Sequence, residues 1–324
     1  MHATAPRSAS RSLLWLPLAI LSPLLTALLV SLVTLFLPLA LASAARAQEA
    51  PPSTAGRDTA DFPARVLVTN DNGIDDPKIA ALARALSAVS ETWVVAPDRD
   101  RSGSGSTLSV VREARVTVEP RDLGPSIRAY AVDGFPADCV VLALTGLMRD
   151  APPDIVVSGI NGGPNLGSDW MFSGTIGAAR VAAFAGVPAV ALSGVDDDIP
   201  GALDAAVEWV VRLVRSEAAR RIVPPDFLSV SFPAVPPGQI RGVRLTERAP
   251  LREIPRLSLQ PPGTWRIIGF EVLDVSVASD SDVAAWEAGF IAVVPMRADE
   301  VDQARLDRWR RRDPGLPEWR GPRR

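Results

Sequence analysis

The sequence feature that most constrains the fold is a series of short apolar runs without polar alternation. They lie at residues 65–69, 92–96, 155–158 and 187–192, and polar loops and segments with helical spacing separate them. Strands that are apolar throughout are typical of parallel sheets whose two faces are covered by helices. We therefore predict the α/β fold class, with a mostly parallel sheet and helices on both faces.

The rest of the chain is expected to add elements around this sheet. The patterns predict helices at residues 77–89, 136–149, 174–185 and 199–221, and further strands at residues 115–118, 127–132, 227–232, 240–246 and 289–294. We expect one folded domain over residues 64–311, with a core over 64–222 and a smaller β-rich C-terminal extension over 223–311. The basic, Pro- and Gly-containing tail at residues 312–324 is expected to be disordered.

The first 47 residues have the character of an export signal. Arg7 and Arg11 precede an uncharged, Leu-rich stretch over residues 12–45, and the Ala-Arg-Ala at residues 45–47 fits an A-x-A cleavage site. The stretch is also long enough to cross a bilayer as an uncleaved anchor, although its three prolines oppose one straight helix. We expect an exported, periplasmic or extracytoplasmic protein, anchored in a membrane only if the signal is uncleaved. Residues 48–63 have linker composition.

Histidine and cysteine are so rare that several reaction classes are excluded. The one histidine, His2, lies inside the export signal, which excludes histidine-dependent hydrolase triads and histidine-based zinc sites. The one cysteine, Cys139, lies in an apolar run, so we expect a buried thiol and no disulfide within the chain. The balance of 34 basic and 37 acidic residues opposes a nucleic-acid polymer as partner.

Three polar loops follow predicted strands, at residues 70–73, 98–104 and 159–165. In open α/β sheets ligands bind outside the carboxyl ends of the strands, so these loops are the place to look for a site. Together they offer a carboxylate, amide oxygens and a hydroxyl, which suit Mg²⁺, Mn²⁺ or Ca²⁺. Each loop also has a plain interpretation as turn chemistry, since Asn72-Gly73 is a common turn dipeptide.

Residues 173–175, Ser-Gly-Thr, open a predicted helix and allow two interpretations. Backbone N–H groups and hydroxyls at a helix N-terminus can bind phosphate. Serine and threonine are equally the usual helix N-caps, and this interpretation is favoured from the residues alone. The chain has neither G-x-G-x-x-G nor a P-loop, so dinucleotide and nucleoside triphosphate binding lack motif support.

Several of these segments, taken in order, resemble the motif set of the SurE survival-protein phosphatases. They are residues 66–74, residues 94–103 (VVAPDRDRSG), residues 134–139 (GFPADC), residues 154–167 (DIVVSGINGGPNLG) and residues 173–175 (SGT). The resemblance is strong over residues 65–193 and thinner afterwards, where residues 240–246 and 289–295 look like the family's final strands. Several long motifs in one order make it highly specific.

The resemblance implies a Rossmann-like domain with C-terminal elements exchanged between subunits of a homodimer or homotetramer. It also implies one divalent metal per subunit, Mg²⁺ or Mn²⁺, and hydrolysis of nucleoside 5'- or 3'-monophosphates, with short polyphosphate as a substrate in some members. Carried over by position, the metal ligands are Asp71, Asn72, Ser102 and Asn161, and Asp71 is the catalytic residue. The expected phosphate- or substrate-binding residues are Ser104, Asn165, Ser173, Gly174 and Thr175.

The chain departs from the family at two places. At position 72 the family carries a second aspartate, so Asn72 removes one negative charge and predicts weaker metal binding. Residues 181–182, Val-Ala, replace the usual Glu-Gly, which we interpret as altered helix packing. We expect a metal-dependent 5'-nucleotidase outside the cytoplasm. The alternatives are a non-catalytic nucleotide- or metal-binding homologue and a general extracytoplasmic phosphatase.

Overall fold

The computed structural model describes residues 62–109, 115–250, 252–274, 277–299, 307–308 and 311. The chain divides into two compact units, residues 1–56 and 57–324, and every described residue belongs to the second. The predicted export signal, most of the predicted linker and the predicted tail at residues 312–324 lie outside the described residues. Among the described residues, no helix has both the length and the apolar character needed to cross a bilayer.

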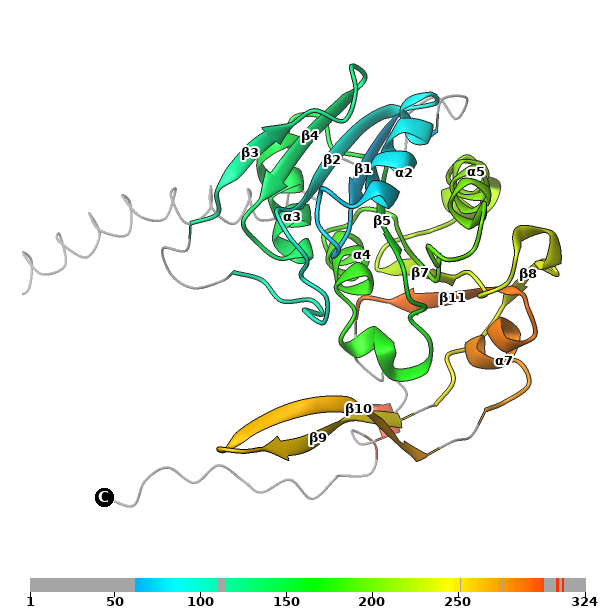
Figure 1. Ribbon diagram of the computed structural model, residues 1–324. Coiled ribbons are helices and arrows are strands. Elements are labelled where there is room, and N and C mark those ends of the chain that lie inside the picture. The colour runs from blue at the N-terminus through cyan, green and yellow to red at the C-terminus, as the bar shows by residue number, and fades with distance from the viewer. Residues whose placement is uncertain are drawn as a thin grey trace, which may run out of the picture. The chain divides into compact units, whose positions relative to one another are not determined.

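A nine-stranded, mostly parallel sheet organises the described part of the chain (Figure 1). Its spatial order is β3-β4-β2-β1-β5-β6-β7-β11-β8. The strands are β1 (Arg65–Thr69), β2 (Glu91–Pro97), β3 (Val118–Arg121), β4 (Ile127–Val132), β5 (Ile155–Asn161), β6 (Ala189–Ser193), β7 (Asp226–Ser231), β8 (Val243–Leu245) and β11 (Ile291–Arg297). The six strands from β4 to β7 in this order are parallel, whereas β3 and β11 pair antiparallel with their neighbours β4 and β7.

Helices cover both faces of this sheet, as predicted. The helices and helical turns are α2 (Pro77–Ser87), α3 (Pro136–Leu142), η2 (Ala143–Leu147), η3 (Gly167–Met171), α4 (Gly174–Phe184), α5 (Ala202–Val214), α6 (Glu217–Arg220), η4 (Pro237–Gln239) and α7 (Asp282–Glu287). Side chains of α2 and α5 pack on one face, and side chains of α3 and α4 pack on the other. The α/β architecture with covered faces is therefore confirmed.

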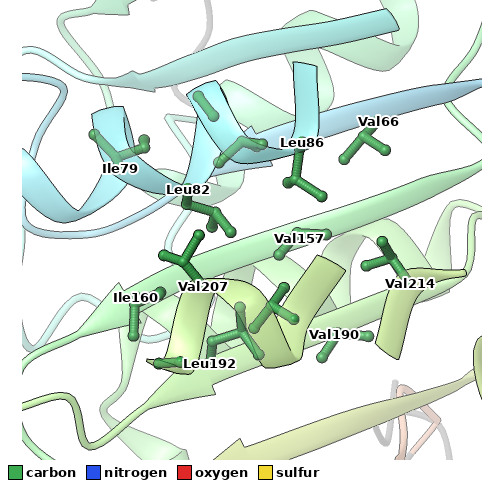
Figure 2. Close-up of a cluster of buried hydrophobic side chains, with 14 of the residues drawn as sticks. Val66, Ile79, Leu82, Leu86, Val157, Ile160, Val190, Leu192, Val207 and Val214 are labelled. Atoms are coloured by element: carbon green, nitrogen blue, oxygen red, sulfur yellow. The ribbon is translucent and has the colours of Figure 1, made fainter. Parts of the chain in front are cut away.

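The core on the α2–α5 face follows directly from the apolar spacing read in the sequence. Ile79, Leu82 and Leu86 project from one side of α2, and they meet sheet residues such as Val66 and Val157 (Figure 2). These side chains have no exposed surface, and each contributes roughly 1.5–3 kcal/mol by its burial. On the opposite face, Cys139 is fully buried as a free thiol, as expected.

Three predicted elements differ from the structure, and one observed hairpin was not predicted. The edge strand β3 begins at Val118 instead of ending there, and the helix expected over residues 136–149 turns into the π-helical η2 after Leu142. The helix expected over residues 199–221 is two helices, because Ser216 caps α6 by accepting a hydrogen bond from the N–H of Ala219 (3.3 Å). An antiparallel hairpin, β9 (Arg252–Gln260) and β10 (Thr264–Asp274), was not expected as strands.

Candidate functional site

The first two polar loops meet at the carboxyl ends of β1 and β2, as predicted. The backbone N–H of Arg101 donates to the carbonyl of Asp71 (2.7 Å), and that of Ile74 donates to the carbonyl of Pro97 (2.8 Å). Gly73 lies between them with a φ of +101°, and a Cβ there would come within 2.9 Å of the Arg99 backbone. Only glycine fits this turn, which holds the two loops together.

Asp71 is a buried carboxylate held by the start of helix α4. The hydroxyl of Thr175 donates to its Oδ1 (2.6 Å), and the backbone N–H of Thr175 donates to its Oδ2 (3.2 Å). Burial raises the pKa of Asp71 above its ordinary value; the hydrogen bonds from Thr175 oppose this rise, and the negative charge of Asp100 adds to it. A carboxylate whose pKa is raised by burial is a better proton acceptor than an exposed carboxylate.

Gly174 brings helix α4 against both the carboxylate and a serine of the second loop. A Cβ on Gly174 would lie 2.7 Å from Ser104 Oγ and 3.0 Å from Asp71 Oδ2. The Ser104 hydroxyl is buried and has no hydrogen-bond partner within the described residues. Asp71, Ser104 and the N-terminus of α4 therefore lie together, and the Ser104 hydroxyl is free to bind a further group.

The second loop is held in this position by its contacts with α4 and η3. Gly105 donates its backbone N–H to the carbonyl of Phe172 (2.8 Å). A side chain at Gly177 would overlap the backbone of Gly105, so the absence of one lets the loop lie directly on the helix. The position of Ser104 thus depends on two glycines that carry no chemistry themselves.

Asn72 supplies a second unpartnered oxygen beside Asp71. Its side-chain Oδ1 is buried and accepts no hydrogen bond from any described residue. A buried amide oxygen without a donor is costly unless it faces a water or a cation. The side chains of the first two loops offer carboxylate, amide and hydroxyl oxygens, which are the ligands that hard divalent cations prefer. The residues at this position therefore fit the predicted metal.

Ser102 is held by a carboxylate that the sequence reading did not assign. Asp100 Oδ1 accepts hydrogen bonds from both the hydroxyl (2.6 Å) and the backbone N–H (2.8 Å) of Ser102. With its proton directed to Asp100, the Ser102 oxygen keeps its lone pairs for another partner. The signal for this role was present in the spacing, since an Asp two residues before a Ser is a common side-chain turn.

The third loop begins with Asn161 at the end of β5. The Asn161 side chain donates to the carbonyl of Gly163 (2.7 Å), and this leaves its amide oxygen available as a ligand. Asn165, by contrast, donates its amide to the hydroxyl of Ser193 (2.6 Å) in the interior, where it fastens the loop. Ser173 is the N-cap of α4 and accepts from the N–H of Ile176 (3.1 Å), as favoured from the residues alone.

A buried ion pair far along the chain fastens the same loop, and sequence reasoning missed it. Arg248 donates to the carbonyl of Gly167 (2.8 Å), and Asp282 accepts from the N–H of Gly167 (3.1 Å). The two side chains lie 3.7 Å apart, and burial lowers the pKa of Arg248 to about 10, which still leaves it charged at neutral pH. No local pattern marks a contact between residues more than eighty positions apart.

The two positions that depart from the family pattern on α4 do not enter this constellation. Ala182 is fully buried in the core, and Val181 packs against that same core. The neighbouring Arg180 lies over the ring of Trp170, with 4.5 Å between the guanidinium carbon and the ring centroid. The contacts of Val181 and Ala182 are therefore those of helix packing.

Polar oxygens, rather than a cluster of classical metal ligands, thus define the site. Within the described ranges, no group of three or more histidine, cysteine, aspartate or glutamate side chains is arranged to hold a metal. The buried donor set near the ends of β1 and β2 contains the carboxylate of Asp71, the amide of Asn72 and the hydroxyl of Ser104. A cation here would bind with less negative charge than an all-carboxylate site provides.

Comparisons with known proteins identify the relatives of this chain. The family profile described as Survival protein SurE matches residues 66–253. The protein named 5'-nucleotidase SurE 1 from Burkholderia lata is 36% identical over 260 residues, which cover 76% of this chain and 95% of that protein. The 5'-nucleotidase SurE of Heliobacterium modesticaldum is 38% identical over 238 residues, or 72% of this chain and 86% of that protein.

A solved structure shares the fold. The crystal structure of SurE protein from Aquifex aeolicus superposes with a TM-score of 0.62 and 28% sequence identity. The alignment covers 75% of this chain and 97% of that structure. The shared architecture therefore includes nearly the whole of the solved relative.

Proposed function

This chain belongs to the SurE family, and we propose that it is a metal-dependent phosphomonoester hydrolase that acts on nucleoside 5'-monophosphates outside the cytoplasm. The relatives named 5'-nucleotidase SurE cover about three quarters of the chain, and this supports a nucleotidase. The observation that carries the proposal is the meeting of the buried carboxylate of Asp71 with the unpartnered hydroxyl of Ser104 at the start of α4, in a loop pair that also holds the unpartnered amide oxygen of Asn72.

The metal, Mg²⁺ or Mn²⁺, would be held by Asp71, Asn72, Ser102 and Asn161. When bound, such an ion polarises a phosphoryl group and lowers the pKa of water. Asp100 supports this assignment because it accepts the hydrogen bond of the Ser102 hydroxyl, and this leaves the lone pairs of the Ser102 oxygen directed away from Asp100. The unsatisfied Oδ1 of Asn72 supports it because that oxygen otherwise pays the cost of burial without a partner.

The substrate phosphate would be positioned by groups at the start of α4. Ser104 has a buried hydroxyl that can donate to a phosphoryl oxygen, and the absence of a side chain at Gly174 lets the start of α4 lie directly against it. The positive end of the α4 dipole favours a negative group at this point. The side chain of Ser173 is used as the helix cap and that of Thr175 holds Asp71, so these two act by positioning.

Asp71 would accept the proton of the attacking water. It is a buried carboxylate beside the position proposed for the metal and the phosphate, so an attacking water there would lie within reach of its oxygens. Thr175 keeps the carboxylate in one orientation through two hydrogen bonds, so the acceptor oxygen is fixed before substrate arrives.

Asn72 gives one rival function specific support. Because this position is an amide, the site has one carboxylate fewer than its family pattern, and a binding protein without turnover would show the same geometry. A general phosphatase, indifferent to the base, is the second rival. The two make different predictions, since the first binds nucleotide without releasing phosphate and the second releases phosphate from any monoester.

The hairpin β9–β10 supports a homodimer or homotetramer as the working form. It carries large apolar side chains that are about half exposed or more, namely Ile254, Leu257, Leu259, Trp265, Ile267 and Ile268. Apolar patches of this kind mark interaction surfaces. The exported location rests on residues 1–47 alone, and membrane attachment would require that this segment stays uncleaved.

The test is a phosphate-release assay on the purified full-length chain. Nucleoside monophosphates and ribose 5-phosphate would be supplied with Mg²⁺, with Mn²⁺ or with chelator. We expect metal-dependent release, fastest for nucleotides, and loss of at least about a hundredfold in Asp71→Ala. Full activity of Asp71→Ala would refute the site, and absence of turnover with any metal would favour the binding-only rival. In that case, activity regained in Asn72→Asp would trace the loss to this position.

A further inference from the structure

A hollow of about 400 Å³ opens at the carboxyl ends of β5, β6 and β7, next to the site described above. It is lined by Gly162, Gly163, Pro164, Gly194, Asp196, Asp197, Ala234 and Trp286. This volume lies within the range of small-molecule sites. The proposed chemistry uses none of these side chains.

The hollow shares a wall with the proposed metal ligand Asn161. The Asn161 side chain donates to the carbonyl of Gly163 (2.7 Å), and the N–H of Gly194 donates to the carbonyls of both Asn161 and Gly163 (3.0 Å each). Gly162 lies between them, and a Cβ there would meet no heavy atom within 4 Å. The loop that contains Asn161 would therefore hold the metal on one side and border the open space of the hollow on the other.

The distance between the two regions suits the length of a nucleotide. Asp71 follows β1, whereas the hollow begins at β5 and extends past β6 to β7. Neighbouring strands lie roughly 4.8 Å apart, so the centre of the hollow is about two strand spacings from Asp71. A phosphate at Asp71 and a base in the hollow can thus belong to one molecule.

Trp286 gives the hollow an aromatic wall of fixed orientation. Its indole N–H donates to the carbonyl of Phe232 (2.7 Å), and the residue stays partly exposed. The same short helix carries Asp282, which fastens Gly167 of the Asn161 loop. A flat aromatic face held in place is the usual platform for stacking a nucleobase.

Two carboxylates provide hydrogen-bond acceptors at the hollow. Asp197 has one oxygen paired with the buried Lys78 (2.7 Å), and Asp196 Oδ1 accepts from the N–H of Asp198 (2.9 Å). Each carboxylate keeps further acceptor capacity, and neither can donate when ionised. Such a pair selects N–H groups, as on the exocyclic amine of adenine, over carbonyl oxygens.

We propose that this hollow binds the base of the substrate, with the ring against Trp286 and an exocyclic amino group toward Asp196 and Asp197. The inference rests on the proposed function, because it assigns the base of the nucleotide whose phosphate lies at Asp71. It names amino-bearing bases as the preferred class. Base recognition would then come from β5–β7 loops, separate from the residues that handle phosphate.

The test compares adenosine 5'-monophosphate with ribose 5-phosphate, which differ only in the base. Trp286→Leu removes the platform, and Ala234→Phe fills the hollow from an exposed position on the β7 side. In each variant we expect the ratio of kcat/KM for the nucleotide to that for the sugar phosphate to fall by about tenfold, the value of one stacked base. Ala185→Phe, at the exposed far end of α4, is the matched control and should keep the ratio.

A second arm tests the carboxylates with inosine 5'-monophosphate, in which an oxo group replaces the amine. The amide of Asp196→Asn can donate as well as accept. This variant should therefore lower the ratio of kcat/KM for the adenine nucleotide to that for the hypoxanthine nucleotide. The same ratios are measured as binding affinities by calorimetry, so an inactive protein still gives a result. Ratios unchanged in all three variants, with phosphate release intact, overturn the base site alone; absence of metal-dependent release in the parent chain overturns the proposed function instead.

Discussion

Thr175 holds the Asp71 carboxylate with two hydrogen bonds, one from its hydroxyl (2.6 Å) and one from its backbone N–H (3.2 Å). One residue at the start of α4 thus contacts both oxygens of a side chain that follows β1. The backbone bond persists in any variant, so substitution tests the hydroxyl alone. Substitution of Thr175 therefore measures how much stability and activity depend on the position of the Asp71 carboxylate.

Thr175→Val should lower both stability and phosphate release. The isosteric change leaves Asp71 Oδ1 buried without its donor, which costs about 1–3 kcal/mol of unfolding free energy. The pKa of Asp71 should rise further, because a hydrogen bond that lowers it is lost. Urea unfolding and kcat/KM are the measurements. Thr145→Val, at an exposed threonine on η2, is the control, and equal urea midpoints for the two variants would contradict the assignment.

Asn72→Asp should tighten metal binding. An added carboxylate next to Asp71 attracts a dication, whereas without metal the two negative charges repel each other. We expect Mn²⁺ affinity, followed by electron paramagnetic resonance, to rise by roughly tenfold. Melting temperature should fall in chelator and recover with Mn²⁺. Gln239→Glu adds the same charge at an exposed position on η4, and an equal gain there would show that net charge, not ligation, is responsible.

Asp100→Asn should weaken metal binding through Ser102. The amide keeps an oxygen that can accept from Ser102, but the negative charge that polarises the hydroxyl is lost. Asp98→Asn is the matched control, because it removes the same charge from the same loop, where Asp98 pairs with Arg99 and Arg101 and not with Ser102. A larger fall in Mn²⁺ affinity for Asp100→Asn than for Asp98→Asn is expected. An equal fall in Mn²⁺ affinity in the two variants would mean that Asp100 acts only through the negative charge that it adds to the loop.

The Cys139 thiol should not react in the folded protein. Burial raises its pKa well above the ordinary value, so at pH 8 the thiolate is scarcely populated and no reagent reaches it. The unfolded chain ionises at lower pH, so reactivity appears on denaturation. A disulfide reagent at pH 8, with and without urea, measures this. Rapid labelling of the native chain would show that α3 opens from the sheet.

The sheet and the polar loops at the carboxyl ends of its strands were predictable because their causes are local. Strands without polar alternation indicated a covered parallel sheet, and the rule that ligands bind at carboxyl ends selected the loops after β1, β2 and β5. The break at Ser216 was missed because the apolar spacing continues across it, and only the capping bond reveals it. The β9–β10 strands were missed because their apolar side chains lie exposed instead of forming a buried face.

The fastening of the site could not be read from the sequence in the same way. Asn165 has the residue type of a ligand, yet its amide binds Ser193 of a neighbouring strand, a choice that only the packing determines. Asp100 and Ser102 are neighbours in sequence, so their bond was within reach of local reasoning. Arg248 and Gly167 are 81 residues apart, and their contact depends on the complete topology.

Arg248→Met should destabilise the fold and loosen the loop that carries Asn161. The variant removes the donor to the Gly167 carbonyl and leaves Asp282, which is almost fully buried, without its cation. Breaking one partner of a buried pair typically costs about 3–5 kcal/mol, and the separation of these two side chains favours the lower end. Urea unfolding measures the loss, and a higher KM with metal affinity reduced in parallel would place the effect at the loop. Arg297→Met removes an exposed pair with Asp299 and should leave the urea midpoint unchanged. If both variants unfold at the same urea concentration, the Arg248–Asp282 pair does not fasten the loop, and the hydrogen bonds made by Asn165 and by the N–H of Gly194 hold it instead.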